Sequence, residues 1–240
     1  MSYKRNIMPA VPLDPNSLTA AMTGIGMNFA AKPDLDAYIE DTLYSASLEG
    51  MEKDDLRVLA VLVTWLEEHH RWINADRLYR VVSQSGLERV RAFWSAVAQW
   101  QSKDRRFLRM THLYAGPRID LLRTGTDFLL GRHGEDVRFR GTPLRIPAKV
   151  LRGRQSDILS SAALAIRHRI YRYRIMMGPT YRADMWAQLE AAPSISVAEL
   201  ARRTYGSFAT ASQVKRDWTL LRSAPEALSP SGISDHVAAQ

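Results

Sequence analysis

The sequence predicts a mainly α-helical protein with two winged-helix-like or helix-turn-helix modules, joined by a small β-hairpin region and a long basic helix. Apolar residues recur every three or four positions through most of the chain, and glycine and proline pairs interrupt that spacing at a few places. Two stretches share an order of short helices without a clear sequence repeat. The predicted segments are a 1–50 N-terminal arm with an acidic helix, a 51–122 winged-helix-like module, a 123–178 β-hairpin and basic helix, a 179–223 helix-turn-helix and a 224–240 disordered tail.

The composition is that of a globular protein that buries its own core. Hydrophobic residues make up 46% of the 240 residues and charged residues 24%. The chain has no cysteine, which excludes disulfides, thiolate nucleophiles and cysteine-based zinc sites. No apolar run is long enough to cross a bilayer, and the proline-broken start is not a convincing signal peptide. We therefore expect a soluble protein of the cytoplasm, with no membrane partner.

The net charge of +8 is unevenly distributed along the chain. The part through Asp55 carries four basic and nine acidic residues, whereas the remainder carries 29 basic and 16 acidic residues. Nearly all of the later positive charge is arginine, whose planar group matches phosphate. This balance favours an anionic partner, most simply nucleic acid, although an arginine-rich codon bias would give the same composition.

The N-terminal arm is expected to be extended or partly disordered over residues 1–30, which have no clear period. Residues Asp34–Ser47 then predict an amphipathic helix with an apolar face (Leu35, Tyr38, Ile39, Leu43) and an acidic face (Asp34, Asp36, Glu40, Asp41). A solvated face is the plainest interpretation of these acids. They could also pair with the protein's own basic surface or with a partner.

The 51–122 module begins with the strongest helix of the sequence, Glu52–Trp72, whose wide apolar face predicts a central position in a bundle. Two further helices are expected, one capped by Asn74 and one ending near Trp100. A strand over 106–116 completes the order of a winged helix. Its third helix carries heavy aromatic residues, which favour a core or a protein interface over DNA reading.

The 123–178 segment predicts a small β-hairpin or meander with short alternating runs at Val137–Arg140 and Leu144–Ile146 and a turn at 134–136. A long helix over Arg154–Met177 is expected after it. This is the densest positive region of the chain, and tyrosines stand between its arginines. Such a pattern suits phosphate contacts, and a solvated helix end is the alternative. The predicted phosphate contacts here are Arg138, Arg140, Arg167, Arg169, Arg172 and Arg174.

The 179–223 segment predicts three helices in the order of a helix-turn-helix. Capping boxes begin the second helix (Ser196 with Glu199) and the third (Thr210 with Gln213), and Tyr205–Ser207 is the turn between them. The third helix is expected to bury Ala211, Val214, Trp218 and Leu221, and a plain three-helix packing unit is the alternative. The predicted base-reading residues are Ser212, Gln213, Lys215 and Arg216, with phosphate contacts from Arg202, Arg203 and Thr210.

No pattern for catalysis or metal binding occurs in the sequence. The phosphate-loop, nucleophile-elbow and zinc-protease motifs are missing, and the six histidines do not share metal-ligand spacing. We therefore predict no catalytic residue, no metal and no cofactor, and a protein that is not an enzyme.

The stretch from Arg182 to Trp218 resembles the helix-turn-helix portion of bacterial transcriptional regulators. The resemblance lies in a packing helix, the run S-V-A-E-L-A-R-R, a Tyr-Gly turn and a valine-containing helix. The two-module layout is also weakly similar to winged-helix antitoxins of the AbiEi type. The first resemblance implies DNA binding through Ser212, Gln213, Lys215 and Arg216.

The sequence therefore favours a DNA-binding transcriptional regulator that reads a major groove of double-stranded DNA with its C-terminal helix. A homodimer is expected, because one short reading helix specifies few base pairs. Two alternatives stay open. One is an antitoxin or adaptor that acts through protein–protein contacts, for example with a toxin, and the other is an RNA-binding protein.

Overall fold

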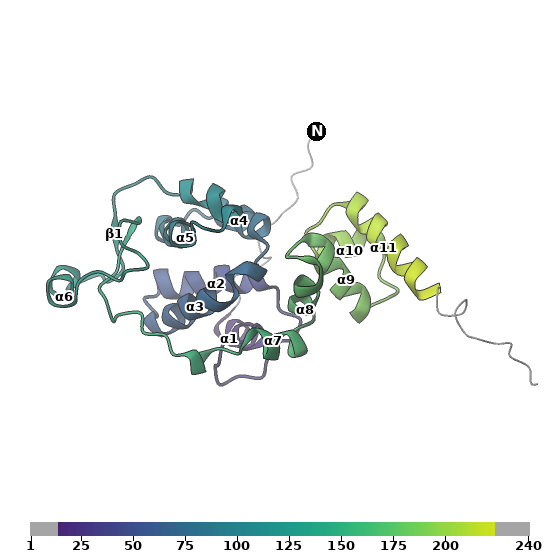
Figure 1. Cartoon of the computed structure of the whole chain (residues 1–240), viewed down its shortest axis with the longest axis horizontal. Helices are drawn as coiled ribbons and strands as arrows, with labels where there is room; N and C mark the ends of the chain where they lie inside the picture. The colour runs from purple at the N-terminus through teal and green to yellow at the C-terminus, as the bar shows by residue number, and fades with distance from the viewer. Residues whose placement is uncertain (1–13, 224–240) are drawn as a thin grey trace, which may run out of the picture. The chain divides into compact units, whose positions relative to one another are not determined.

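The computed structural model describes residues 14–223, which form two compact units that divide after Thr180 (Figure 1). Both units are helical, so the predicted mainly α class is confirmed. The rest of the arm (1–13) and the tail (224–240) lie outside the described residues. The C-terminal unit contains α9 (Tyr181–Ala191), α10 (Val197–Arg203) and α11 (Phe208–Ser223).

The core of the first unit is built around α3, as its wide apolar face predicted. The Asp55 carboxylate caps this helix by accepting the backbone N–H groups of Arg57 and Val58 at 3.0 and 2.9 Å. Every residue from Val58 to Leu66 is buried, because neighbouring helices cover α3. The helices of this core are α2 (Ile39–Glu52), α3 (Leu56–His69), α4 (Ala75–Ser83) and α5 (Glu88–Trp100), with the 3-10 turn η1 (His70–Trp72) after α3.

The prediction of an extended N-terminal arm is wrong within the described residues. Residues Pro15–Gly24 form helix α1, which Asp14 caps and which buries Leu18 and Met22. Gly24 allows the chain to pack tightly, since a Cβ there would lie 1.7 Å from the carbonyl oxygen of Asp34. The Asp-Pro pair was the available signal, because proline is favoured in the first turn of a helix after a capping aspartate.

The predicted wing of the first module does not form. Residues Arg105–His112 make a 3-10 helix, η2, rather than a strand, because Phe107 and Met110 are buried three positions apart on one face. The only strands among the described residues are β1 (Ile119–Asp120) and β2 (Leu144–Arg145), and they pair in parallel with Ile119 opposite Leu144. The first module therefore has helices in the predicted order, but the strand predicted over 106–116 does not form.

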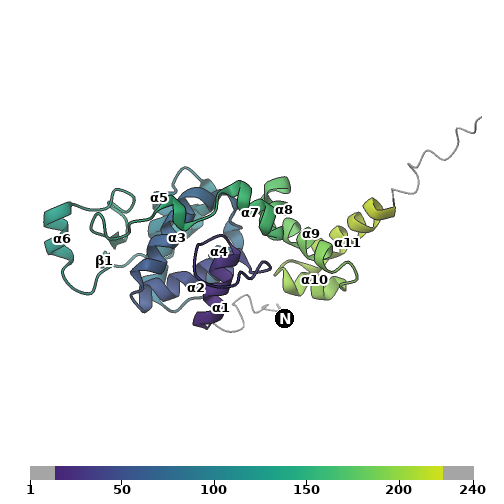
Figure 2. The ribbon, with the colours of Figure 1, turned by 90° about the horizontal axis from the view of Figure 1, so that it is seen from below.

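The predicted β-hairpin is also wrong. Residues 137–140 form a turn, and the segment before them folds into helix α6 (Thr126–His133) between Gly125 and Gly134, both at positive φ. Parallel strands need a longer connection than a hairpin turn, and α6 lies within that connection. Helix α6 lies at the end of the first unit, apart from α2 and α3 in both views (Figure 1, Figure 2).

The predicted long basic helix is divided into three short pieces: η3 (Gln155–Asp157), α7 (Ser161–Arg167) and α8 (Arg169–Met177). The break falls at His168, whose backbone is extended and whose Nδ1 accepts the N–H of Tyr171 at 3.1 Å. Nε2 of His168 lies 2.9 Å from the carbonyl oxygen of Ala37. The histidine therefore starts α8 as its N-cap and ties it to the segment before α2.

A buried ion pair joins α8 to α2, contrary to two predictions. Arg174 is fully buried and donates to both carboxylate oxygens of Glu40, at 2.6 and 2.9 Å. Glu40 also accepts the N–H of Asn74, and Arg174 also donates to the carbonyl of Trp72. The predicted acidic face of α2 is thus partly interior, where Asp41 pairs with Arg77. Arg174 cannot contact a phosphate, because it has no exposed surface.

A second buried polar cluster connects α3, α7 and α8. The Tyr171 hydroxyl lies 2.7 Å from Nδ1 of His69 and 3.1 Å from the Ser161 hydroxyl, while Nε2 of His69 lies 3.0 Å from the Leu159 carbonyl. Burial lowers the pKa of His69 to about 4 and raises the pKa of Tyr171 to about 12. Burial likewise lowers the pKa of His168 to about 4, and the Arg174 charge adds to that effect. Both histidines are therefore neutral in the folded protein near pH 7.

We expect Glu40→Gln to lower the free energy of unfolding by about 3–5 kcal/mol, because it leaves the Arg174 charge buried without a counter-ion. Asp36→Asn is the matched control, since it removes an ion pair with Arg169 whose aspartate is 69% exposed. That change should cost less than about 1 kcal/mol. Urea denaturation measures both, and equal losses would contradict the structural role of the buried pair.

We also expect the protein to lose stability in mild acid. A histidine with a depressed pKa in the folded state binds its proton more readily when unfolded, so its contribution is complete above its ordinary pKa of 6.5 and declines as the pH falls towards 4. By about pH 5 each histidine should account for a loss on the order of 2 kcal/mol.

The control for this effect is His168→Asn, because asparagine keeps an N-cap acceptor but does not titrate. The drop in unfolding free energy between about pH 7.5 and pH 5 should shrink by about 2 kcal/mol in this variant. An unchanged pH dependence would show that His168 is not responsible.

Candidate nucleic-acid interface

The turn between α10 and α11 has the length that the helix-turn-helix prediction requires. Four residues, Thr204–Ser207, separate the two helices, and Tyr205 adopts a left-handed backbone with φ +56°. Gly206 follows against the packing helix, where a Cβ would lie 2.2 Å from Cε of Met185. The break predicted at Tyr-Gly-Ser is thus confirmed, and its cause is a tight approach of the turn to α9.

The N-cap of α11 is Ser207, three residues before the predicted Thr210. The Ser207 hydroxyl oxygen accepts the backbone N–H of Thr210 at 3.0 Å and lies 2.8 Å from the Thr210 hydroxyl. The cap predicted at Ser196 does form, with its hydroxyl accepting the N–H of Glu199 at 3.2 Å. The Glu199 side chain pairs with Arg202 and Arg203.

The core of the C-terminal unit holds α11 through one stripe of side chains. Ala211 and Val214 are buried as predicted, and the ring of Trp218 lies 5.4 Å from that of Trp186 on α9. The predicted burial of Leu221 is wrong, because it is 64% exposed. Helix α11 therefore extends past its own core, and its last turns present apolar side chains to solvent.

The predicted base-reading residues divide into two groups. Gln213 and Arg216 are exposed on α11 and linked, with Nη2 of Arg216 donating to Oε1 of Gln213 at 2.6 Å. Gln213 donates in turn to Asp217 at 2.8 Å, and Arg182 of α9 donates to the same carboxylate at 2.7 Å. This network of exposed side chains connects the polar face of α11 to α9.

Ser212 and Lys215 lie half-buried beside that face. The Lys215 ammonium group donates to the carbonyl of Ile195, which lies just before α10. Both residues line a hollow of about 400 Å³ on the surface between α10 and α11. Its wall is completed by Val197, Arg216, Thr219 and Leu220.

The predicted phosphate contacts of the C-terminal unit have partners within it. Arg202 and Arg203 are exposed at the end of α10, and both donate to Glu199 over 2.5–2.7 Å. Hydrogen bonds from Arg202, then from Arg203, lower the pKa of Glu199 to about 2, so it stays charged. Thr210 is half-buried and bonded to Ser207. A phosphate would therefore compete with Glu199 for these arginines.

Several of the predicted phosphate contacts of the first unit already have partners within the protein. Arg138 is held by Asp136 at 2.7 Å and by Glu67, and Arg169 is held by Asp36 at 3.0 Å. Arg172 is half-buried over the ring of Tyr173. Arg140 and Arg167 are exposed, on the 137–140 turn and at the end of α7. Some arginines of the dense basic stretch therefore form ion pairs within the protein.

Two exposed apolar side chains of α11 are absent from the predicted set of interface residues. Phe208 is 56% exposed at the start of α11, and Leu220 is 70% exposed beside the hollow. The signal for Leu220 was the pair Leu220–Leu221, because a helix cannot bury both of two consecutive residues in a narrow stripe.

Residues 14–223 contain no group of three or more His, Asp or Glu side chains placed to hold a metal ion. Among those same residues, no helix combines the length and the apolar character that crossing a membrane requires. Comparison of the chain with protein-family models, with curated proteins and with solved structures finds no match.

The cap assignment is testable in the full chain. Ser207→Ala should lower the stability of the C-terminal unit by about 1 kcal/mol, because it leaves a backbone donor of the first turn without its acceptor. Thr210→Val keeps the shape of the side chain and should cost less. Hydrogen exchange of the α11 amides would report both changes, and a larger effect of Thr210→Val would support the cap predicted from the sequence.

Proposed function

We propose that the protein is a cytoplasmic DNA-binding regulator that reads a major groove with α11. The observation that carries the proposal is the exposed Gln213–Arg216 pair in the first half of α11, after a four-residue turn from α10. In a helix-turn-helix, residues in this part of the second helix meet base edges. Glutamine can pair with adenine and arginine with guanine through two hydrogen bonds each.

The small net charge of the C-terminal unit favours sequence-specific contacts with bases over tight non-specific binding to phosphates. Residues 181–223 carry six basic and four acidic side chains, a net charge of +2. Few phosphates can be neutralised by so small a surplus, so the affinity for duplex DNA should depend only moderately on salt. Arg202 and Arg203 pair with Glu199, so they become available as additional cations for DNA once a phosphate displaces that carboxylate.

A homodimer fits this proposal, because two reading helices on one face of the duplex double the number of base pairs read. The exposed leucines at the end of α11, Leu220 and Leu221, supply apolar surface for such a contact.

The same apolar surface supports a second candidate, a protein-interaction module such as an antitoxin or adaptor. The hollow beside α11 and Leu220 would then receive an apolar side chain of a partner protein. RNA binding is a third candidate that would use the same cations. Binding assays on duplex DNA, single-stranded DNA and RNA separate these candidates.

We expect Gln213→Ala combined with Arg216→Ala to weaken binding to a preferred duplex, selected from a random pool, by roughly 30-fold or more, because both base contacts are lost. Binding to random duplex should weaken by much less. Arg222→Ala is the matched control, since Arg222 is exposed on the same helix, where it lies over the ring of Trp218. That control should weaken both duplexes equally.

Equal losses on preferred and random duplexes in the double variant would contradict the assignment of base reading to α11. If the unaltered protein binds no duplex at moderate salt, the protein-interaction candidate takes its place. A preference for single-stranded or structured RNA would instead favour the third candidate.

A further inference from the structure

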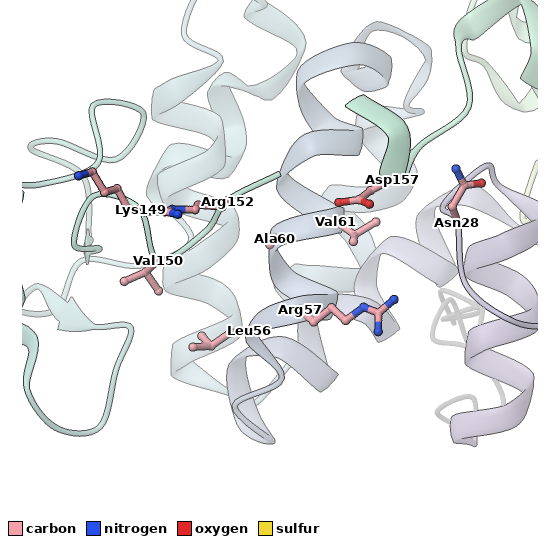
Figure 3. A pocket seen from close by; sticks show the side chains of 9 residues that line it. All are labelled: Asn28, Leu56, Arg57, Ala60, Val61, Lys149, Val150, Arg152 and Asp157. Atoms are coloured by element: carbon pink, nitrogen blue, oxygen red, sulfur yellow. The ribbon is translucent and has the colours of Figure 1, made fainter. Parts of the chain in front are cut away.

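The first unit contains a basic hollow whose lining includes none of the residues predicted to contact DNA. It has a volume of about 290 Å³ and lies against the first half of α3 (Figure 3). Ala60 and Val61 of α3 lie in the middle of it, and both are buried. Its residues are Asn28, Leu56, Arg57, Ala60, Val61, Lys149, Val150, Arg152 and Asp157.

Three cations surround this hollow without any ion pair among the described residues. Arg57, Lys149 and Arg152 are all exposed, whereas at least 11 of the 21 arginines in residues 14–180 form ion pairs with carboxylates. Lys149 and Arg152 lie to one side of Ala60, and Arg57 extends towards the other (Figure 3). One acid, Asp157, shares the lining, so the hollow keeps a surplus of positive charge.

The backbone around the hollow is fixed by close packing against α3 and by a hydrogen bond between its two edges. Leu151 is buried, and Gly153 lies so close to α3 that a Cβ would meet the Thr64 hydroxyl at 1.6 Å. The Asn28 backbone N–H donates to the carbonyl of Asp157 at 2.8 Å, which joins the two edges. The Arg57 guanidinium lies 5.7 Å from the centre of the Phe29 ring. The side chains of Arg57, Lys149 and Arg152 therefore extend from well-packed backbone.

Lys149 adopts a left-handed backbone with φ +71°, which a non-glycine residue rarely does. Such outliers collect at binding sites, where a side chain is kept for its function at a cost in stability. The charges of the hollow also act on His133. Its pKa is lowered first by desolvation and then by the charges of Lys149, Arg132 and Arg152. Positive potential therefore extends beyond the hollow itself.

We propose that this hollow binds a small organic phosphate. Arg57, Arg152 and Lys149 would hold the phosphate group, because arginine and lysine both form charge-assisted hydrogen bonds with phosphate oxygens. Leu56, Val61 and Val150 would contact a compact apolar portion of the ligand. The volume lies at the lower end for ligand sites, which favours a small molecule over an extended nucleic acid.

The test is calorimetric titration of the full chain at constant ionic strength with inorganic pyrophosphate, adenosine monophosphate and uncharged adenosine. We expect both phosphates to bind and adenosine not to bind. Arg57→Ala combined with Arg152→Ala should weaken the phosphates at least tenfold. Arg105→Ala is the matched control, because Arg105 is exposed, has no ion pair among the described residues and does not line the hollow.

Two further variants separate binding from folding. Asp157→Asn should tighten phosphate binding several-fold, because it removes the only negative charge in the lining. Lys149→Asn should weaken binding without lowering the thermal midpoint of the free protein, because asparagine tolerates a left-handed backbone.

The proposal is overturned if neither phosphate binds, or if Arg105→Ala weakens binding as much as the double variant does. It is also overturned if Arg57 and Arg152 affect only the binding of a short DNA duplex, since nucleic-acid phosphates would then be the ligand. None of these results bears on base reading by α11, which the variants at Gln213 and Arg216 test separately.

Discussion

The first unit depends on the buried ion pair between Glu40 and Arg174. Two charges without exposed surface are stable only when each satisfies the other and the remaining hydrogen bonds are made. Here the N–H of Asn74 and the carbonyl of Trp72 complete the set, so α2, α8 and the turn between α3 and α4 meet at one point. The pair also changes the role expected for the basic segment that contains Arg174. Several arginines of this segment form buried or local ion pairs, so fewer of them are available to bind a partner.

The helices with regular apolar spacing were predictable, and those that depend on distant partners were not. Asp55 and Ser196 act as caps that are visible within a few residues of sequence. Glu40 looks like part of a solvated face, because the arginine that pairs with it lies 134 positions away. The break at His168 likewise depends on a bond to Ala37 that no local pattern reveals. A strand is predicted over 106–116, but the burial of Phe107 and Met110, three positions apart, favours a 3-10 helix over Arg105–His112.

The candidate interface was predictable to a similar extent. Helical spacing alone places Gln213 and Arg216 outward, and the structure exposes both, but spacing could not show that Lys215 turns to the carbonyl of Ile195. The exposure of Leu221 follows from the end of the C-terminal core, which a single helix does not reveal. The basic hollow on α3 was not predictable, since its cations come from α3 and from a segment some 90 residues later that crosses it. The proposed division of work therefore assigns base reading to α11 and small-phosphate binding to the first unit.

The most direct test of this division is to map the amides that respond when duplex DNA is added to the full chain. Two-dimensional NMR of the labelled protein, titrated with a selected duplex, gives that map residue by residue. We predict that the largest shifts fall between Ser207 and Arg216, on the last residue of the turn and the first part of α11. Shifts confined to residues 14–180, with α11 unchanged, would contradict the assignment and would place the DNA contact in the first unit.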